Sequence, residues 1–232
     1  MKQQKIYIIV LTLFIIGILA GCVAGPTKVR LDYKPSIILS DIGSNKNIGV
    51  FSFADNREEI DPKAYGTIVK LVTAELPIAY KSDIKTETVI TDYITNAFRN
   101  ELKSLGFQII DRDVYSRALP FREVVNNLKE LELGEVDKII IGRIRFFRWT
   151  EAGFAGALFQ GLMPKPRLNA EIQVQVIDHK SMKILWAGSG WALEKSTESF
   201  PKNPERENKI KVGLNKALTQ IIRNDGFIGS LL

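Results

Sequence analysis

Leu168-Asn-Ala-Glu-Ile-Gln-Val-Gln-Val176 alternates apolar and polar side chains without a break, and this stretch decides the fold. Successive side chains of a strand point to opposite faces, so one face of this strand enters a core and the other meets water. A sheet with one wet face is typically antiparallel. Asp178-His-Lys-Ser181 then has the composition of a turn, and residues 182–193 return as a second strand. The pattern predicts a β-hairpin.

Three segments around this hairpin have the apolar spacing of amphipathic helices. The first runs from about residue 86 to Leu105 and ends at Gly106, which suits the left-handed position after a helix. The second covers residues 114–131 and is broken at Pro120, and the third covers 207–224 and ends at Asp225-Gly226. Each has one apolar face, which predicts that all three pack against a sheet.

Further strands are predicted over residues 47–54, 67–72, 107–111 and 137–149, while residues 74–85, which include Pro77, are expected to form a loop. The order of elements is strands, helix, strand, helix, a meander of three strands and a final helix. This order predicts an α+β fold with a single domain, in which a mainly antiparallel sheet carries amphipathic helices on one face.

Composition narrows the possible functions. The chain of 232 residues has a formal net charge of +6, and removing Lys2 and Lys5 with the first 21 residues leaves +4 on the remaining 211. We expect no nucleic-acid partner, because the cations are scattered along the sequence. Cys22 is the only cysteine, so no disulfide is expected within the chain and the fold must rest on its core.

The first 22 residues have the pattern of a secretory signal. A basic start, Met1 to Lys5, precedes uncharged residues 6–20 and then Leu19-Ala-Gly-Cys22. This ending resembles the lipobox of bacterial lipoproteins. The resemblance implies diacylglyceryl transfer to Cys22, cleavage before it, and acylation of the new amino terminus with chains such as palmitate. It divides the chain into a signal peptide (1–21), a lipidated tether (22–35) and a periplasmic α+β domain (36–232).

The alternative for this region is one transmembrane helix, because Lys5 and Lys28 bracket twenty-two uncharged residues. A span needs about 20 apolar residues, but Gly21, Gly25 and Pro26 weaken that interpretation. Both interpretations tether the same domain to a membrane. Val23 follows the modified cysteine where an aspartate would hold a lipoprotein at the inner membrane. The resemblance therefore implies an outer-membrane protein facing the periplasm.

Candidate catalytic residues are few. His179 is the single histidine and falls in the predicted turn, which disfavours Ser-His-Asp catalysis. A carboxylate-based envelope hydrolase would rely on Asp111 and Asp113, although these residues are better suited to capping the next helix. No phosphate-binding loop and no metal-ligand spacing is present, so we expect no cofactor, no metal and no enzymatic activity.

Two segments are candidates for structural or binding roles. Residues 55–61 are acidic, but they lack a calcium-loop pattern, and an Asp55–Arg57 pair shaping the strand exit is the preferred interpretation. Residues 152–163 carry no charge where a polar hairpin loop is expected. Such a segment either packs on the core or contacts a partner or lipid. The candidate contact residues are Phe154, Phe159, Leu162 and Met163.

The lipobox occurs together with Ile48-Gly-Val-Phe-Ser-Phe-Ala-Asp-Asn-Arg57, a helix ending in Leu-Gly-Phe and a late hairpin. This combination resembles the YajG-type lipoproteins. More loosely it is similar to auxiliary lipoproteins of ABC-type lipid transport and to the first domain of TolB-like proteins. The resemblance implies a non-enzymatic accessory or binding component of a cell-envelope complex, with an envelope protein as partner. A lipid-binding or lipid-transfer auxiliary is the alternative that shares its anchor.

Overall fold

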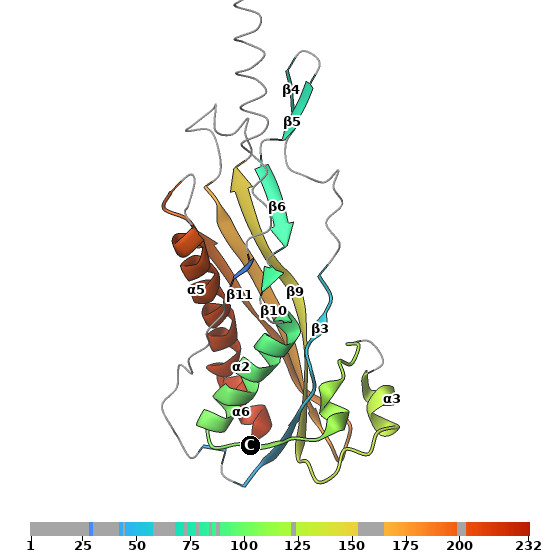
Figure 1. The fold of residues 1–232 in the computed structure, drawn as a ribbon. Helices are drawn as coiled ribbons and strands as arrows, with labels where there is room; N and C mark the ends of the chain where they lie inside the picture. Colours follow the sequence, from blue (N-terminus) through green and yellow to red (C-terminus); the bar gives the residue numbers. More distant parts are fainter. Residues whose placement is uncertain are drawn as a thin grey trace, which may run out of the picture.

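The computed structural model describes residues 28–29, 42–43, 45–57, 68–71, 74–77, 79–83, 85–86, 89–121, 124–152, 165–198 and 203–232. Its central feature is a tall mixed sheet of seven strands with helices packed against it (Figure 1). The α+β class predicted from the sequence is confirmed.

Three long strands form one half of the sheet as an antiparallel meander. They are β9 (Lys138–Ala152), β10 (Arg167–Asp178) and β11 (Ile184–Lys195). Val174 pairs with Gly142 on one side and with Gly188 on the other. The hairpin predicted from the alternation of residues 168–176 is therefore confirmed, and the alternation of burial ends at Val176, where Ile177 is buried as well.

The other edge of β9 is shared by three short strands. β2 (Asn47–Val50) and β3 (Ala54–Asp55) lie parallel to it, and β6 (Ala79–Asp83) lies antiparallel further along. β8 (Gln108–Ile110) then pairs in parallel with β2. The sheet is therefore mixed, which corrects the prediction of a mainly antiparallel sheet. The chain from β2 to β8 crosses over through a helix, and such connections join parallel strands.

The loop predicted over residues 74–85 is wrong. β4 (Ile68–Leu71) and β5 (Ala74–Pro77) form an antiparallel pair, β6 joins the main sheet, and β7 (Lys85–Thr86) pairs in parallel with β1 (Lys28–Val29). β4 and β5 form a two-stranded sheet, so Pro77, the last residue of β5, lies on an edge strand, where proline is tolerated. β1 falls within the segment 22–35 that the sequence suggests is a tether.

Helices α2 (Ile90–Ser104), α5 (Asn203–Ile222) and α6 (Asp225–Leu231) cover one face of the sheet (Figure 1). Gly106 has a φ of 87° just after α2, as its predicted role at the helix end requires. Asp225-Gly226 was expected to end the helical structure, but α6 begins there. The side chain of Asn224 accepts a hydrogen bond from the Phe227 amide at 3.1 Å and caps the new helix.

The opposite face carries a smaller core at one end of the sheet. The helical segment predicted over 114–131 is interrupted around Pro120 as expected, but its two parts are short: a 3-10 turn at Asp113–Ser116 and helix α3 (Val124–Lys129). Tyr115 is fully buried there, and its hydroxyl donates to the carbonyl of Leu133 at 2.9 Å. Burial raises the pKa of Tyr115 to about 12. This second core leaves the other end of that face uncovered by the described helices.

Candidate functional site

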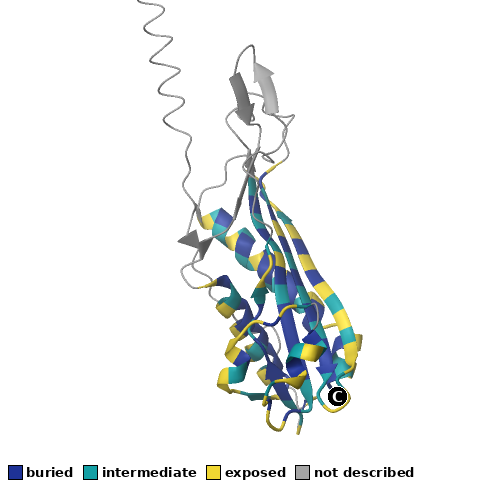
Figure 2. Cartoon of the chain, turned by 90° about the vertical axis from the view of Figure 1, so that its right-hand side faces the viewer, coloured by how far each residue is buried: buried dark blue, intermediate teal, exposed yellow. Residues whose placement is uncertain are grey.

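The uncovered part of the second face is made by alternate residues of β9, β10 and β11, and we call it the open face. Burial alternates along these strands, with every second residue turned away from the helices (Figure 2). The strand register assigns to the open face Arg143, Arg145, Phe146, Arg148 and Thr150 of β9, Arg167, Asn169, Glu171, Gln173 and Gln175 of β10, and Ala187, Ser189, Trp191, Leu193 and Lys195 of β11.

A β-bulge gathers three arginines on this face. Glu171 pairs with Phe146, whereas the next residue, Ile172, pairs with Ile144, so Arg145 is the extra residue of β9. An extra residue shifts the alternation of a strand by one position. Arg143 before the bulge and Arg148 after it therefore lie on the same face, although one position is odd and the other even.

A line of polar contacts fixes two of these arginines across the strands. The Nε of Arg143 donates to Oε1 of Gln173 at 2.8 Å, and Nε2 of Gln173 donates to Oε1 of Glu171 at 2.7 Å. Nη1 of Arg145 lies 3.6 Å from the same carboxylate oxygen. The guanidinium of Arg143 also lies 4.5 Å from the ring centroid of Phe121. Such cation–π and polar contacts hold the side chains in defined positions.

Apolar side chains accompany the cations at the β11 edge. Trp191 is 59% exposed and Leu193 is 36% exposed, in neighbouring register positions on the open face. The backbone N–H of Trp191 donates to Oε1 of Gln220 on α5 at 2.9 Å, so part of the free edge of β11 is blocked against another strand. The open face therefore offers side chains for binding at a position where strand addition is hindered.

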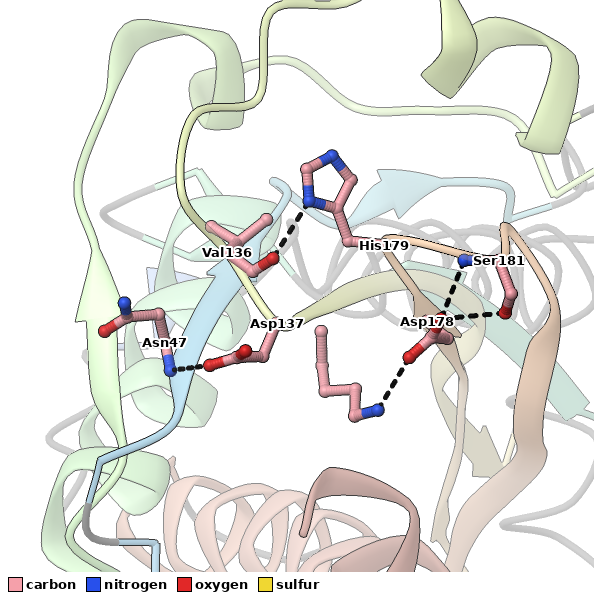
Figure 3. A network of polar contacts seen from close by, with 7 residues as sticks. Asn47, Val136, Asp137, Asp178, His179 and Ser181 are labelled. Carbon is pink, nitrogen blue, oxygen red and sulfur yellow. Dashed lines mark hydrogen bonds and ion pairs between the residues drawn. The ribbon is translucent and has the colours of Figure 1, made fainter.

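A separate polar network closes the hairpin at the far end of the sheet (Figure 3). Asp178 accepts from Nζ of Lys138 at 2.8 Å, and from the amide and hydroxyl of Ser181 at 2.8 and 2.7 Å. Nδ1 of His179 donates to the carbonyl of Val136 at 2.9 Å. These groups satisfy one another, and the network is best explained as a structural clasp of the turn.

Asp178 makes this clasp sensitive to acid. The hydrogen bond from Lys138, followed by those from Ser181, holds the pKa of Asp178 well below its ordinary value. A depressed carboxyl pKa adds stability that is fully present above the unfolded-state pKa near 4 and is lost as the pH falls below it. We expect Asp178→Asn to lower the free energy of unfolding at pH 7 by about 1 kcal/mol, and the difference from the native chain to shrink by pH 3. Urea unfolding at both pH values measures this. An equal loss of stability at pH 7 and pH 3 would contradict this prediction. The control is Glu130→Gln, which changes the same charge at an exposed position.

The residues singled out in the sequence are dispersed. Arg57 contacts Asp55 through Nε and Nη2 at 2.8 and 2.6 Å, and this pairing holds the pKa of the carboxyl below its ordinary range. Asp111 and Asp113 are exposed, and Arg112, without a side-chain cap, precedes the 3-10 turn, so their predicted capping role is wrong. Cys22, Phe154, Phe159, Leu162 and Met163 lie outside the described residues.

Within the described ranges, no group of three or more His, Cys, Asp or Glu side chains is placed to hold a metal ion. No helix in the same ranges is long and apolar enough to cross a bilayer. Sequence reasoning missed the open face, since it treated residues 137–149 as a strand of apolar residues. The spacing of Arg143, Arg145 and Arg148 was the available signal, but only the bulge shows that the three share a face.

No protein-family model matches the sequence, and no curated protein matches it. Among solved structures, protein XCC0632 from Xanthomonas campestris, of family DUF330, aligns with a TM-score of 0.52 at 9% identity, covering 88% of this chain and 96% of that one. Lipoprotein GNA1162 from Neisseria meningitidis aligns at 0.38 and 12% identity, over 67% and 87% of the two chains. CT253 from Chlamydia trachomatis aligns at 0.45 and 10% identity, over 80% and 98%.

The similarity to XCC0632 concerns the fold alone, because 9% identity carries no functional residue from one chain to the other. The other two alignments are too distant to support an argument. The function of this chain must therefore be inferred from its own residues.

Proposed function

We propose that this protein is a lipid-anchored, non-enzymatic binding component of the bacterial cell envelope, held at the outer membrane through Cys22 and facing the periplasm. The lipobox ending at Cys22 supports the anchor. Among the described residues, Trp191 and Leu193 of the open face are exposed apolar side chains that could bind a partner. Asp111 and Asp113, the carboxylates of the hydrolase alternative, are both exposed. An accessory that binds a partner fits these features better than a hydrolase.

The apolar segment 152–163 is the proposed contact with that partner. β9 ends at Ala152 and β10 begins at Arg167, and Thr150 pairs with Arg167, so both ends of the connection meet at one end of the sheet. The exposed Leu193 belongs to the adjoining rows of the open face. This arrangement is the observation that carries the proposal, because both ends of the uncharged segment lie at the end of the sheet where Leu193 is exposed on the open face.

Lipid attachment is tested by replacing Cys22 with serine. Serine lacks the thiol that accepts diacylglycerol, so we expect incorporation of an alkyne-tagged fatty acid to be lost and the protein to leave the membrane fraction. In-gel detection of the tag measures this, and Ser189→Ala, on the open face, is the control that should retain the label. Persistent labelling of the Cys22→Ser chain would overturn the anchor.

The partner is tested by photo-crosslinking in cells, with a photoreactive amino acid in place of Phe159 of the full lipoprotein. A discrete protein adduct is expected for an accessory of an envelope complex. Adducts to lipid would instead support the lipid-binding or lipid-transfer alternative. The matched control is Val212, which is 44% exposed on α5 on the opposite side of the sheet and should give no adduct. Crosslinks confined to the chain itself would place the segment in its own core and end the proposal.

A further inference from the structure

The open face has a strongly biased charge. Arg143, Arg145, Arg148, Arg167 and Lys195 contribute five positive charges from three strands, and Glu171 is the single carboxylate among them. A surface with this excess attracts an anionic partner.

The cations are presented in an ordered way. The bond from Arg143 to Gln173 and the contact of Arg145 with Glu171 use only part of each guanidinium, which has five N–H donors. Arg145 is 45% exposed, and its guanidinium lies 5.2 Å from the ring centroid of Phe146. Binding would therefore cost little side-chain entropy, and donors would remain for phosphate oxygens.

The apolar residues among the cations indicate what kind of anion is bound. The interface of a protein partner is typically depleted of charge at its centre, whereas this face carries five cations together with Trp191 and Leu193, which pair with Glu171 and Asn169 of β10. Exposed tryptophan beside arginine and lysine is typical of residues at the level of lipid headgroups. The mixture therefore fits a membrane surface better than an acidic protein.

We infer that the open face lies against anionic phospholipid headgroups of the membrane that carries the anchor. This inference rests on the proposed lipid attachment at Cys22, which keeps the domain near the bilayer at a high effective concentration. A modest attraction per cation then suffices to orient the domain, with Trp191 and Leu193 at the headgroup level.

The test uses the full lipidated protein reconstituted into vesicles. A spin label is placed at Ser189→Cys on the open face, or at Asn100→Cys on α2 as the control, since acylation leaves Cys22 with no free thiol. In vesicles with about 30% phosphatidylglycerol, we expect the ratio of oxygen to nickel-complex accessibility at position 189 to rise about two-fold or more over pure phosphatidylcholine. The rise should vanish in about 0.5 M sodium chloride, and position 100 should stay aqueous throughout.

Two triple variants with equal changes in net charge sharpen the result. Arg145→Gln, Arg167→Gln and Lys195→Gln together should abolish the phosphatidylglycerol effect at position 189. The matched set Lys103→Gln on α2, Lys216→Gln on α5 and Arg223→Gln in the turn between α5 and α6 replaces exposed residues and should leave it intact. Thermal unfolding of both sets verifies that each is folded.

Three outcomes would overturn the inference. Position 189 could stay aqueous in phosphatidylglycerol vesicles, both triple variants could lose the effect equally, or position 189 could be immobilised only when an acidic protein is added. Mass spectrometry of the purified protein reports the acylation of Cys22 independently. Loss of the anchor is therefore distinguishable from failure of the open face to contact lipid.

Discussion

Replacing Phe98 with alanine is expected to lower the free energy of unfolding by about 3–5 kcal/mol, a large share of the stability of a domain of this size. Phe98 has no exposed surface and projects from α2 into the main core. Its ring centroid lies 5.5 Å from that of Phe53 and 5.7 Å from that of Phe227. Truncation would leave a cavity where α2, α6 and the segment after β2 meet, and these elements cannot all collapse into it.

Urea unfolding of the full-length chain in detergent measures this loss. The control is Phe146→Ala, which removes the same ring from the half-exposed open face and should cost less than half as much. Equal losses from the two variants would contradict the assignment of Phe98 to the centre of the core.

Replacing Gly190 with alanine is expected to cost about 3 kcal/mol and to lower the midpoint of thermal unfolding by about 6–12 °C. A Cβ on Gly190 would overlap the carbonyl oxygen of Ala217, which is backbone of α5 and has no rotamer to change. The methyl group would therefore push α5 away from β11, its principal contact with the sheet. Valine at the same position should be worse, because it adds two further carbons to the clash.

Two other glycines provide matched controls for this effect. The atoms nearest to a Cβ on Gly188, on the same face of β11, belong to the side chain of Trp186 and not to backbone, so Gly188→Ala should cost less. A Cβ on Gly229 in α6 meets no atom within 4 Å apart from its chain neighbours and the backbone of its own helix, so Gly229→Ala should be neutral or stabilising by about 0.5–1 kcal/mol. Similar melting temperatures for the Gly190 and Gly188 variants would show that α5 can shift at little cost.

Sequence reasoning succeeded where a residue's environment repeats with a fixed period. The alternation along residues 168–176 located β10 and its hairpin with β11, and the stripe through Ile94 and Phe98 located α2. Sequence reasoning failed where the secondary structure of a segment is decided by pairing with a neighbouring element and not by the pattern of its own residues. β6 has no clear period, and it forms a strand because β9 extends to Ala152 and offers a free edge.

The candidate site divides in the same way. The lipobox at Cys22 and the uncharged segment with Phe159 each consist of consecutive residues, so both can be recognised in the sequence alone. The open face combines residues from three strands, and its arginines share a side only because the bulge opposite Glu171 shifts the register of β9. A register shift is a property of the pairing of two strands, so the sequence of either strand alone does not predict it.

The sequence by itself determined the α+β class, the long hairpin, the main amphipathic helices and the expectation of a lipid anchor. All of these depend on the periodicity or composition of short contiguous segments, because the spacing of apolar residues within one segment indicates a helix or a strand. Only the tertiary structure decided that the central strands are partly parallel, that α3 covers one end of the second face, and that the other end presents cations on the same face as Trp191. These features follow from which distant segments pair and which face each helix covers, and that choice is made by the packing of the whole chain.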